Sequence, residues 1–568
     1  MAFRKAVTEQ STTTTEKGAL SYDGSSCARL EFFSKALARD KVNATTDLRI
    51  VQICHAAWNE SPQDFLRLLA HKRWCRGGAG ERHVAQVAWN WLAKTHPEQI
   101  IPNLETIPFY GRYKDLISFF EQTEFFKEAL DILIKQLQTD YQTYQQATSE
   151  ISGSSESSEI SGSSKSRQLL GSISLAAKWA PSEKRAADRA AKLAGRVVPS
   201  HYVARKLWYL IKKDSTAPHS TIMRWYRQDV LTPLRTATGV VEQLLCAQKY
   251  DQVDFSKLPS RALAIYSRKC FPAHMPDRFK SWQADVLAGK AKINTSQVDP
   301  YEIVSRLIGY WMTQHNHHSY YKAATPAEIA TLESFYTDQV AKYQAQMAET
   351  GVSLGNTMVI ADVSGSMYGT PLAVSISLAI WMSALNTPDF RDLFMTFHEQ
   401  PKIIDLSDCT TLYQRVVRTV EAEWGGSTNL QAAFDLILER AVERHLDQSD
   451  MPKRLVIVSD MQFDTACQPN VFTNFETITA KYREAGYQMP QIVFWNVRGN
   501  TTDSPVTKDT HGTALIGGFS KSLINMLLLD EPLKTPMEMM FQTIDSPDFD
   551  RMKYVNTSGQ LVSTRILR

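Results

Sequence analysis

The spacing of apolar residues changes once along the chain. Up to about residue 350 apolar side chains recur at three- and four-residue intervals, which is the period of an amphipathic helix. The clearest stretches are residues 30–40, 61–74, 81–96, 127–147 and 326–350. We therefore predict a helical domain over 27–350. Successive helices of this kind usually pack as antiparallel pairs, and a HEAT-like α-solenoid is the natural large form, although no strict repeat is visible.

Beyond residue 350 short β-rich runs alternate with helical patterns. The runs NTMVIADVS, KRLVIVSDM and QIVFWNV are strand-like, and PLAVSISLAIWMSAL and NLQAAFDLILERAVERH between them are helical. This order is typical of βαβ units around a mainly parallel sheet, in which ligands bind beyond the carboxyl ends of the strands. We therefore predict an α/β, Rossmann-like domain over 351–568.

Two segments contain few large apolar groups. Residues 1–26 are rich in serine and threonine, and residues 151–166 read ISGSSESSEISGSSKS. Such segments bury too little surface to offset the chain entropy lost on folding. We predict a disordered tail over 1–26 and a disordered surface loop over 151–166, the latter a tolerated insertion without function of its own.

Composition narrows the class of protein only slightly. The 568 residues are 43% apolar and 22% charged, which is ordinary for a globular chain, and the net charge of +3 marks no general affinity for nucleic acid. The seven cysteines contain no C-x-x-C pair, and neither a signal-peptide core nor a membrane-spanning run is present. We expect a cytoplasmic protein without a membrane partner.

The first strand of the C-terminal region leads into a loop rich in oxygen ligands. Asp362, Ser364 and Ser366 form a D-x-S-x-S pattern directly after the strand. One carboxylate and two hydroxyls on a tight turn suit Mg²⁺ or Mn²⁺ and not a soft metal. The alternative is an aspartate that only caps the following helix.

Two later segments extend this pattern. Gly425–Asn429 opens a predicted helix and includes Thr428, and an apolar strand ends at Asp460. The three loops together resemble the von Willebrand factor A domain and its metal-ion-dependent adhesion site, over roughly residues 352–530. The resemblance implies a domain of that type.

Carried over to this chain, the resemblance implies a cation held by residues of all three loops. Ser364, Ser366 and Thr428 would coordinate directly, and Asp362 and Asp460 directly or through water. Family members usually have Gly-Gly-Thr in the second loop, whereas Ser427 intervenes here, so the second-loop ligand is either Thr428 or Ser427. One position would stay open for a ligand, often a partner's carboxylate. Asp464 is either an outer-sphere group or an ordinary solvated loop residue.

Four segments of the helical region, together with one segment of the C-terminal region, resemble a second family. They look like the domain-of-unknown-function family 2828, and the order of a helical region followed by an A domain is similar to the TROVE, or Ro, proteins. The Ro likeness implies binding to structured or single-stranded RNA. The segments are Arg76–Arg82, Tyr110–Asp115, Lys178–Lys184, Pro259–Ala262 and Ser459–Asp464.

A basic stretch supports RNA binding independently. Residues 165–227 contain fourteen lysines and arginines against three acidic residues, interleaved with tryptophan and tyrosine. Cations neutralise phosphates and aromatic faces stack bases, but aromatic residues at helical spacing are equally often packing groups. A smaller basic cluster comprises Arg67, Lys72, Arg73, Arg76 and Arg82. The candidate RNA-binding residues are Lys178, Lys184, Arg185, Arg189, Arg205, Lys206, Lys212, Lys213, Arg224 and Arg227.

No catalytic residues emerge from the sequence. Neither a phosphate-binding G-x-x-x-x-G-K-[ST] loop nor a G-x-S-x-G elbow is present, and the histidines of His315–His318 have no acidic partner at ligand spacing. We therefore favour a non-enzymatic, metal-dependent RNA-binding component of a ribonucleoprotein. The alternative is a metal-dependent protein-interaction scaffold without RNA, and the distant alternative is a metal-assisted hydrolase.

Overall fold

The computed structural model describes residues 12–16, 18–38, 42–152, 164–183, 185–397, 400–422, 429–463, 474–499, 501, 503–528, 532–566 and 568. The chain divides into two compact units. Unit 1 comprises residues 1–88, 254–552 and 563–568, and unit 2 comprises residues 89–253 and 553–562. Each unit is therefore assembled from segments that are far apart in the sequence.

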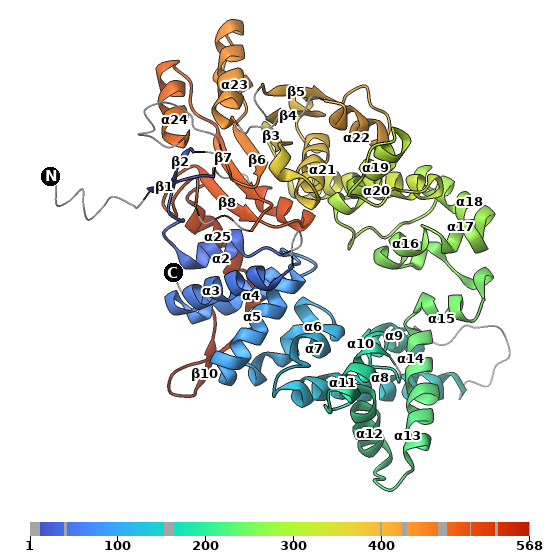
Figure 1. Cartoon of the computed structure of the whole chain (residues 1–568). Helices are drawn as coiled ribbons and strands as arrows, with labels where there is room; N and C mark the ends of the chain where they lie inside the picture. Colours follow the sequence, from blue (N-terminus) through green and yellow to red (C-terminus); the bar gives the residue numbers. More distant parts are fainter. Residues whose placement is uncertain are drawn as a thin grey trace. The chain divides into compact units, whose positions relative to one another are not determined.

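A six-stranded sheet forms the centre of unit 1, in the order β5-β4-β3-β6-β7-β8 (Figure 1). Neighbouring strands are parallel except β4 and β5, which are antiparallel. The predicted, mainly parallel sheet in the C-terminal part is thereby confirmed. The strands are β3 (Thr357–Asp362), β4 (Leu393–Phe397), β5 (Lys402–Asp405), β6 (Arg454–Ser459), β7 (Gln491–Asn496) and β8 (Thr513–Gly517).

Three strands of this sheet, the two central ones and the edge strand β8, are buried along their whole length. Every residue of β3, β6 and β8 is buried, which explains why these runs are continuously apolar and do not alternate with polar residues. Helix α21 (Thr370–Ala384) packs against β3, β4 and β6, and α2 (Ala28–Lys35) packs against β7 and β8. The strand ends are thus held on a fully packed core.

The remaining helices of unit 1 come from both sides of residue 350. Helix α19 packs against α21 and α22, so part of the N-terminal helical region belongs to the same compact unit as the sheet. This grouping differs from a division at residue 351. These helices are α3 (Ala44–Glu60), α4 (Pro62–Arg73), α16 (Ser260–Tyr266), α17 (Cys270–His274), α18 (Pro276–Leu287), α19 (Pro300–Gln314), α20 (Pro326–Thr350), α22 (Leu412–Val420), α23 (Leu430–Arg444), α24 (Asn474–Glu484) and α25 (Pro536–Ile544).

Unit 2 is helical apart from a short hairpin, so the prediction of a helical N-terminal region is confirmed. Its longest helix, α8, packs against α7, α9 and α12. The helices are most of α5 (Arg82–Thr95), then α6 (Ile107–Tyr110), α7 (Tyr113–Phe120), α8 (Phe126–Ser152), α9 (Ser164–Ser172), α10 (Ala176–Trp179), α11 (Ala186–Leu193), α12 (Pro199–Lys212), α13 (His219–Trp225), η3 (Tyr226–Leu231), α14 (Thr232–Ala237) and α15 (Val241–Cys246).

The hairpin of unit 2 comes from the end of the chain. Strands β9 (Lys553–Val555) and β10 (Leu561–Ser563) pair with each other. The Asn103 side chain accepts from the Lys553 N–H and donates to its carbonyl oxygen, both at 2.8 Å. The Gln99 side chain likewise accepts from the Val555 N–H at 2.9 Å and donates to the Val555 carbonyl oxygen at 2.7 Å. Buried amide side chains thus attach the hairpin to the start of unit 2.

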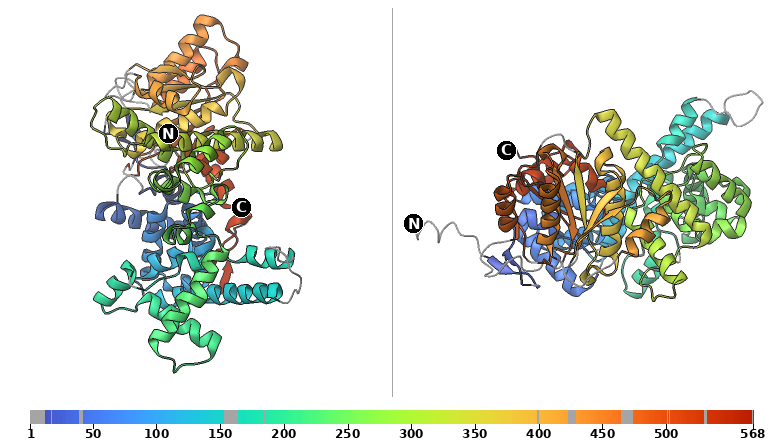
Figure 2. Two further views of the ribbon diagram at one scale, coloured as in Figure 1. Left: turned by 90° about the vertical axis from the view of Figure 1, so that its right-hand side faces the viewer. Right: turned by 90° about the horizontal axis from the view of Figure 1, so that it is seen from above.

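The low-complexity insert lies mostly outside the described residues. Helices α8 and α9 lie side by side and are joined by this insert (Figure 2). Residues 153–163 are not described, while the flanking residues of 151–166 end α8 and begin α9. The predicted loop therefore stays a prediction for 153–163.

Part of the predicted disordered tail is ordered, which corrects that prediction for residues 12–16 and 18–26. Strands β1 (Thr12–Thr14) and β2 (Leu20–Tyr22) form an antiparallel hairpin. Tyr22 exchanges both backbone hydrogen bonds with Ser504. The Thr15 hydroxyl donates to the Phe463 carbonyl oxygen at 2.7 Å. Backbone pairing and hydroxyl contacts order this segment, which has few large apolar groups, so its low apolar content gave no sign of the order.

None of the helices in the described ranges is both long enough and apolar enough to cross a membrane.

Candidate functional site

Two buried carboxylates lie at the carboxyl ends of the two central strands of the sheet. Asp362 is the last residue of β3, and Asp460 directly follows β6. In the parallel register Ala361 lies opposite Val458, so the carboxyl ends of β3 and β6 lie at the same edge of the sheet. The two aspartates are 0% and 1% exposed. The structure therefore brings together two of the predicted ligands on neighbouring strands.

The Asp362 carboxylate is oriented by two hydrogen bonds. Its Oδ1 accepts from the Ser364 N–H at 2.9 Å, and its Oδ2 accepts from the Ser459 hydroxyl at 2.6 Å. Ser459 was not predicted from the sequence. Its position as the last residue of the strand beside β3 was the available signal, because the strand pairing determines what faces Asp362.

The two serines of the D-x-S-x-S loop point their hydroxyls toward each other. A short 3-10 turn over Gly365–Met367 follows Ser364, and the Met367 N–H donates to the Ser364 carbonyl oxygen at 3.0 Å. This turn brings the Ser364 and Ser366 Oγ atoms within 3.1 Å of each other. Two hydroxyl oxygens are thus presented next to the buried Asp362.

An arginine that was not predicted from the sequence lies beside this loop. Arg498 follows β7, the next strand along from β6. Its Nη1 donates to the Ser366 carbonyl oxygen at 2.6 Å and lies 3.5 Å from Asp460 Oδ2. Asp460 Oδ1 accepts from the Gln462 N–H at 3.3 Å. Only the strand order, which places β7 next to β6, could have indicated that Arg498 lies near Asp460.

Burial dominates the electrostatics of the two carboxylates. It raises the pKa of Asp362 to about 6, and the negative charge of Asp460 adds to the increase, while hydrogen bonds from Ser459 and Ser364 oppose it. A cation would relieve both the desolvation and the mutual repulsion. Carboxylate and hydroxyl oxygens are the donors that Mg²⁺ and Mn²⁺ prefer. The described residues therefore fit such an ion.

The second predicted loop lies outside the described residues. Ser427 and Thr428 fall within 423–428, and Asp464 falls within 464–473. The neighbouring Asn429 is described, and its side chain caps α23 by accepting from the Ala432 N–H at 3.0 Å. The choice between Thr428 and Ser427 stays open.

In the described part of the chain, three or more histidine, cysteine or acidic side chains nowhere converge in a group that could hold a metal ion. The histidines of His315–His318 are exposed, and His315 Nδ1 lies 2.9 Å from the Trp311 carbonyl oxygen. The Trp311 ring stacks on His317 at 5.6 Å. These histidines thus lie in an exposed segment after α19, beside Trp311.

Seven of the ten predicted RNA-binding residues have exposed side chains in unit 2. Lys206 is instead half-buried and forms an ion pair with Asp131 at 2.5 Å. Lys178 is also half-buried, lies 3.8 Å from Glu242 and stacks over Trp179. Lys184 lies outside the described residues. The exposed residues are Arg185, Arg189, Arg205, Lys212, Lys213, Arg224 and Arg227.

The aromatic residues of this stretch are mainly packing groups. Trp225 and Tyr226 are buried, and the Trp208 ring contacts Trp225 edge-on at 5.2 Å. The Tyr226 hydroxyl donates to the Pro181 carbonyl oxygen at 3.1 Å. Tyr209 differs, with 54% of its surface exposed. Of the two alternatives, the basic face over an aromatic core describes this stretch better.

The smaller basic cluster is largely structural. Arg67 is fully buried and donates to the carbonyl oxygens of Ile544 and Ser546 at 2.6 and 2.8 Å. Lys72 is fully buried as well, and its burial lowers its pKa to about 7. Arg73 is 3% exposed. These three cations cannot contact RNA in the folded chain, so their inclusion in an RNA surface was wrong.

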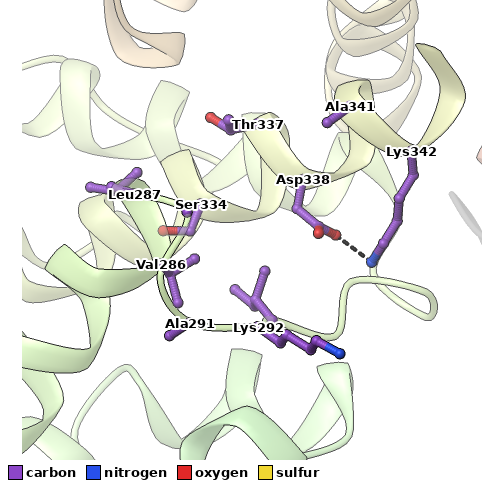
Figure 3. Close-up of a pocket in the computed structure, with 11 residues that line it drawn as sticks. Val286, Leu287, Ala291, Lys292, Ser334, Thr337, Asp338, Ala341 and Lys342 are labelled. Carbon is purple, nitrogen blue, oxygen red and sulfur yellow. Dashed lines mark hydrogen bonds and ion pairs between the residues drawn. The ribbon is translucent and has the colours of Figure 1, made fainter. Parts of the chain in front are cut away.

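A cavity of about 370 Å³ lies elsewhere in unit 1, between the end of α18 and α20 (Figure 3). Its charged residues are partly matched to one another, since Lys342 Nζ lies 2.6 Å from Asp338 Oδ2. Thr295 also donates to that oxygen, at 2.5 Å. None of the strand-end residues lines this cavity, so it is separate from the candidate cation site.

Comparison with known proteins gives a similar sequence and a similar solved structure, each of which aligns with most of the chain. An uncharacterised protein of Acanthamoeba polyphaga mimivirus is 29% identical over 564 residues, covering 94% of this chain and 87% of that protein. The crystal structure of the Deinococcus radiodurans Ro (RSR) protein aligns with 88% of this chain and 98% of its own, at 14% identity and a TM-score of 0.37.

Two family models match the sequence. Residues 356–563 match domain of unknown function DUF7788. Residues 15–168 and 112–350 match domain of unknown function DUF2828, which confirms the resemblance found in the helical segments. Since the two DUF2828 matches together span more than half of the sequence, the chain belongs to the DUF2828 family.

Proposed function

We propose that this chain is a non-enzymatic binding protein in which the strand-end loops of unit 1 hold Mg²⁺ or Mn²⁺ and present it to an anionic ligand. The observation that carries the proposal is the pair of buried aspartates, Asp362 and Asp460, beside two hydroxyls 3.1 Å apart. Burial of two like charges is costly unless a cation compensates them. Arg498, 3.5 Å from an Asp460 oxygen, compensates that carboxylate in part.

The resemblance to the von Willebrand A domain implies one further ligand of this site, from the loop that contains Ser427 and Thr428. Thr428, or Ser427 in its place, would complete the oxygen ligands of an ion that prefers six. At least one position would then remain for the ligand. When bound, the ion would supply a concentrated positive charge that attracts a carboxylate or a phosphate.

Calorimetry of the full chain with Mn²⁺ and Mg²⁺ tests the cation site. We expect saturable binding that Asp362→Asn abolishes, with the variant melting no lower than the parent because it removes a buried charge. Asp405→Asn is the matched control, since Asp405 ends the edge strand β5 and is exposed. A folded Asp362→Asn variant that binds Mn²⁺ as tightly as the parent would overturn the site.

RNA binding by unit 2 is the second candidate, favoured by the seven exposed cations at 185–227. Such residues attach phosphates without reading sequence, and their contribution weakens steeply as salt rises. Because Trp225 and Tyr226 of that stretch are buried, its contacts with RNA would be made mainly by charged side chains. A metal-dependent protein scaffold remains the alternative if this surface binds no RNA.

Filter binding across a salt series separates these alternatives. We expect a log–log slope of about −0.7 per neutralised phosphate for single-stranded RNA. Reversing the charges of Arg185, Lys212 and Lys213 should reduce affinity, whereas Asp405→Asn should not. An affinity for RNA that neither salt nor the reversals change would overturn RNA binding by this surface.

A further inference from the structure

Two exposed tyrosine rings lie next to the candidate cation loop in unit 1. Tyr368 directly follows the turn Gly365–Met367 that holds Ser366, and Tyr320 lies between α19 and α20. Their ring centroids are 5.8 Å apart at an interplanar angle of 64°. Tyr368 is 51% exposed and Tyr320 is 60% exposed. Two neighbouring aromatic rings that remain half exposed offer an apolar surface to a ligand.

The neighbours of the two rings hold them in place. The buried Tyr321 hydroxyl donates to the Gly369 carbonyl oxygen at 2.5 Å and thereby ties the two segments together. The Ser319 hydroxyl brackets Tyr321 by accepting from its N–H and donating to its carbonyl oxygen. Gly369 has φ +99°, which side-chain-bearing residues rarely adopt. These contacts fix the segments that carry the two rings, so the rings need little rearrangement to receive a ligand.

The charged groups of the loop that precedes Tyr368 favour an anionic ligand. Arg498 contacts the Ser366 carbonyl oxygen and lies near Asp460, so a fixed guanidinium stands beside the proposed ion. The oxygens of a phosphate can meet both an ion and an arginine, as those of a carboxylate can, so the aromatic rings have to decide between the two ligands. The aromatic pair adds a flat apolar surface. A nucleotide combines a phosphate with a flat ring, and sequence-independent stacking of bases on aromatic side chains is common in single-strand binding.

We propose that Tyr320, Tyr368 and the cation loop together bind one nucleotide of a single-stranded RNA. The base lies against the tyrosine rings, and the adjoining phosphate is held by the ion and Arg498. This inference rests on the proposed cation site and names its ligand. It is separate from the basic surface of unit 2, which contacts phosphates alone.

Fluorescence anisotropy with a labelled single-stranded RNA of about ten nucleotides, in Mn²⁺, tests the proposal in the full chain. We expect the double variant Tyr320→Ala, Tyr368→Ala to bind the RNA about tenfold more weakly, since stacking of one base is lost. The matched control is Tyr320→Phe, Tyr368→Phe, which keeps both rings and should bind like the parent. Calorimetry with Mn²⁺ should give the same affinity for all three proteins.

The outcomes distinguish the two proposals. If the parent binds no Mn²⁺, the cation site fails and the nucleotide assignment fails with it. If all three proteins bind Mn²⁺ equally and the alanine variant binds RNA as tightly as the parent, only the nucleotide assignment is overturned. If the alanine variant instead loses affinity for an acidic peptide containing tryptophan while RNA binding is unchanged, the ligand is a protein and the assignment is overturned.

Discussion

At the scale of single residues, the strand-end site combines groups that the sequence indicated with groups that only the fold brings near. Asp362, Ser364 and Ser366 lie in one recognisable pattern, so their joint role was predictable. Ser459 lies 97 residues after Asp362, and Arg498 lies 132 residues after Ser366, so their contacts depend on strand order. Local patterns reveal ligands on one loop, but the partners that orient them are set by pairing of distant strands.

Arg498→Gln should increase the affinity for Mn²⁺ by about tenfold, because it removes a positive charge 3.5 Å from an Asp460 oxygen. Calorimetry at low salt measures the change. Arg498→Lys keeps the charge and serves as the control, with affinity close to that of the parent. A weaker affinity in Arg498→Gln would mean that the arginine supports the cation site.

His71 makes unit 1 sensitive to acid. The imidazole is 2% exposed, lies 5.2 Å from the Phe33 ring, and has no hydrogen-bond partner among the described residues. Burial, with a smaller effect of Lys72, lowers its pKa to about 3 from the ordinary value of 6.5. The unfolded chain therefore binds the proton more readily, and stability should fall as pH drops below about 6.5.

His71→Leu should remove that loss, because leucine of similar volume carries no proton. We expect the variant to lose about 2 kcal/mol less unfolding free energy than the parent between pH 7 and pH 5. Urea unfolding at both pH values measures the difference. His318→Leu, at an exposed position, is the control and should follow the parent. Identical pH dependence in His71→Leu would exclude this histidine as the source.

At the scale of elements, periodicity predicted the long amphipathic helices and the buried strands well. Helix α20 spans 326–350 and α21 spans 370–384, close to the apolar stretches that indicate them. The β1–β2 hairpin was missed because it is ordered by hydrogen bonds and not by apolar burial. The composition of a segment shows how much apolar surface it can bury. It does not show whether the backbone pairs with a distant residue such as Ser504.

The hairpin stabilises the loop that follows Asp460. Thr15 donates to the Phe463 carbonyl oxygen at 2.7 Å, and the Glu16 N–H donates to Gln462 Oε1 at 2.7 Å. Thr15→Val should therefore cost about 1 kcal/mol of unfolding free energy and weaken Mn²⁺ binding. Thr13→Val, at the half-buried middle position of β1, is the control. Unchanged stability and Mn²⁺ affinity in Thr15→Val would show that the loop does not depend on the hairpin.

Deletion of residues 153–163 should leave stability nearly unchanged. Helices α8 and α9 already lie side by side, and the free energy of loop closure changes weakly with loop length. Thermal melting tests this, with a shift of less than about 5 °C expected. A replacement of the same residues by glycine and serine of equal length is the control. A larger drop in the deletion alone would indicate strain, and a drop in both would indicate that the insert packs.

At the scale of the whole molecule, the sequence predicted the classes of structure but not their grouping. A helical region and an α/β region are both present, yet α2–α4 and α16–α20 belong to the same unit as the sheet. The apolar face of α19 shows that the helix is amphipathic, and nothing in its period identifies α21 as the element it packs against. The assignment of a helix to a unit depends on which element its apolar face packs against, and a single sequence does not show this.

A chain ending at Met552 should melt well below the full chain. The removed residues include Lys553 and Val555, which bond to Asn103 and Gln99 in unit 2. They also include Thr564, which contacts the buried Arg67, and Arg568, which pairs with Asp64 and Asp545 in unit 1. Calorimetric melting measures the loss. Arg565→Ala, at an exposed ion pair, is the control with little expected change.

The path of the chain also has a consequence for synthesis in the cell. The polypeptide passes between the two units after residues 88, 253, 552 and 562. A ribosome releases α2 and α4 long before β7, β8 and α25, which pack against them, and the ion pair of Arg568 with Asp64 forms only once Arg568 has emerged. The parts of α2 and α4 that contact these late elements therefore stay exposed through most of translation, which favours binding of the nascent chain by chaperones.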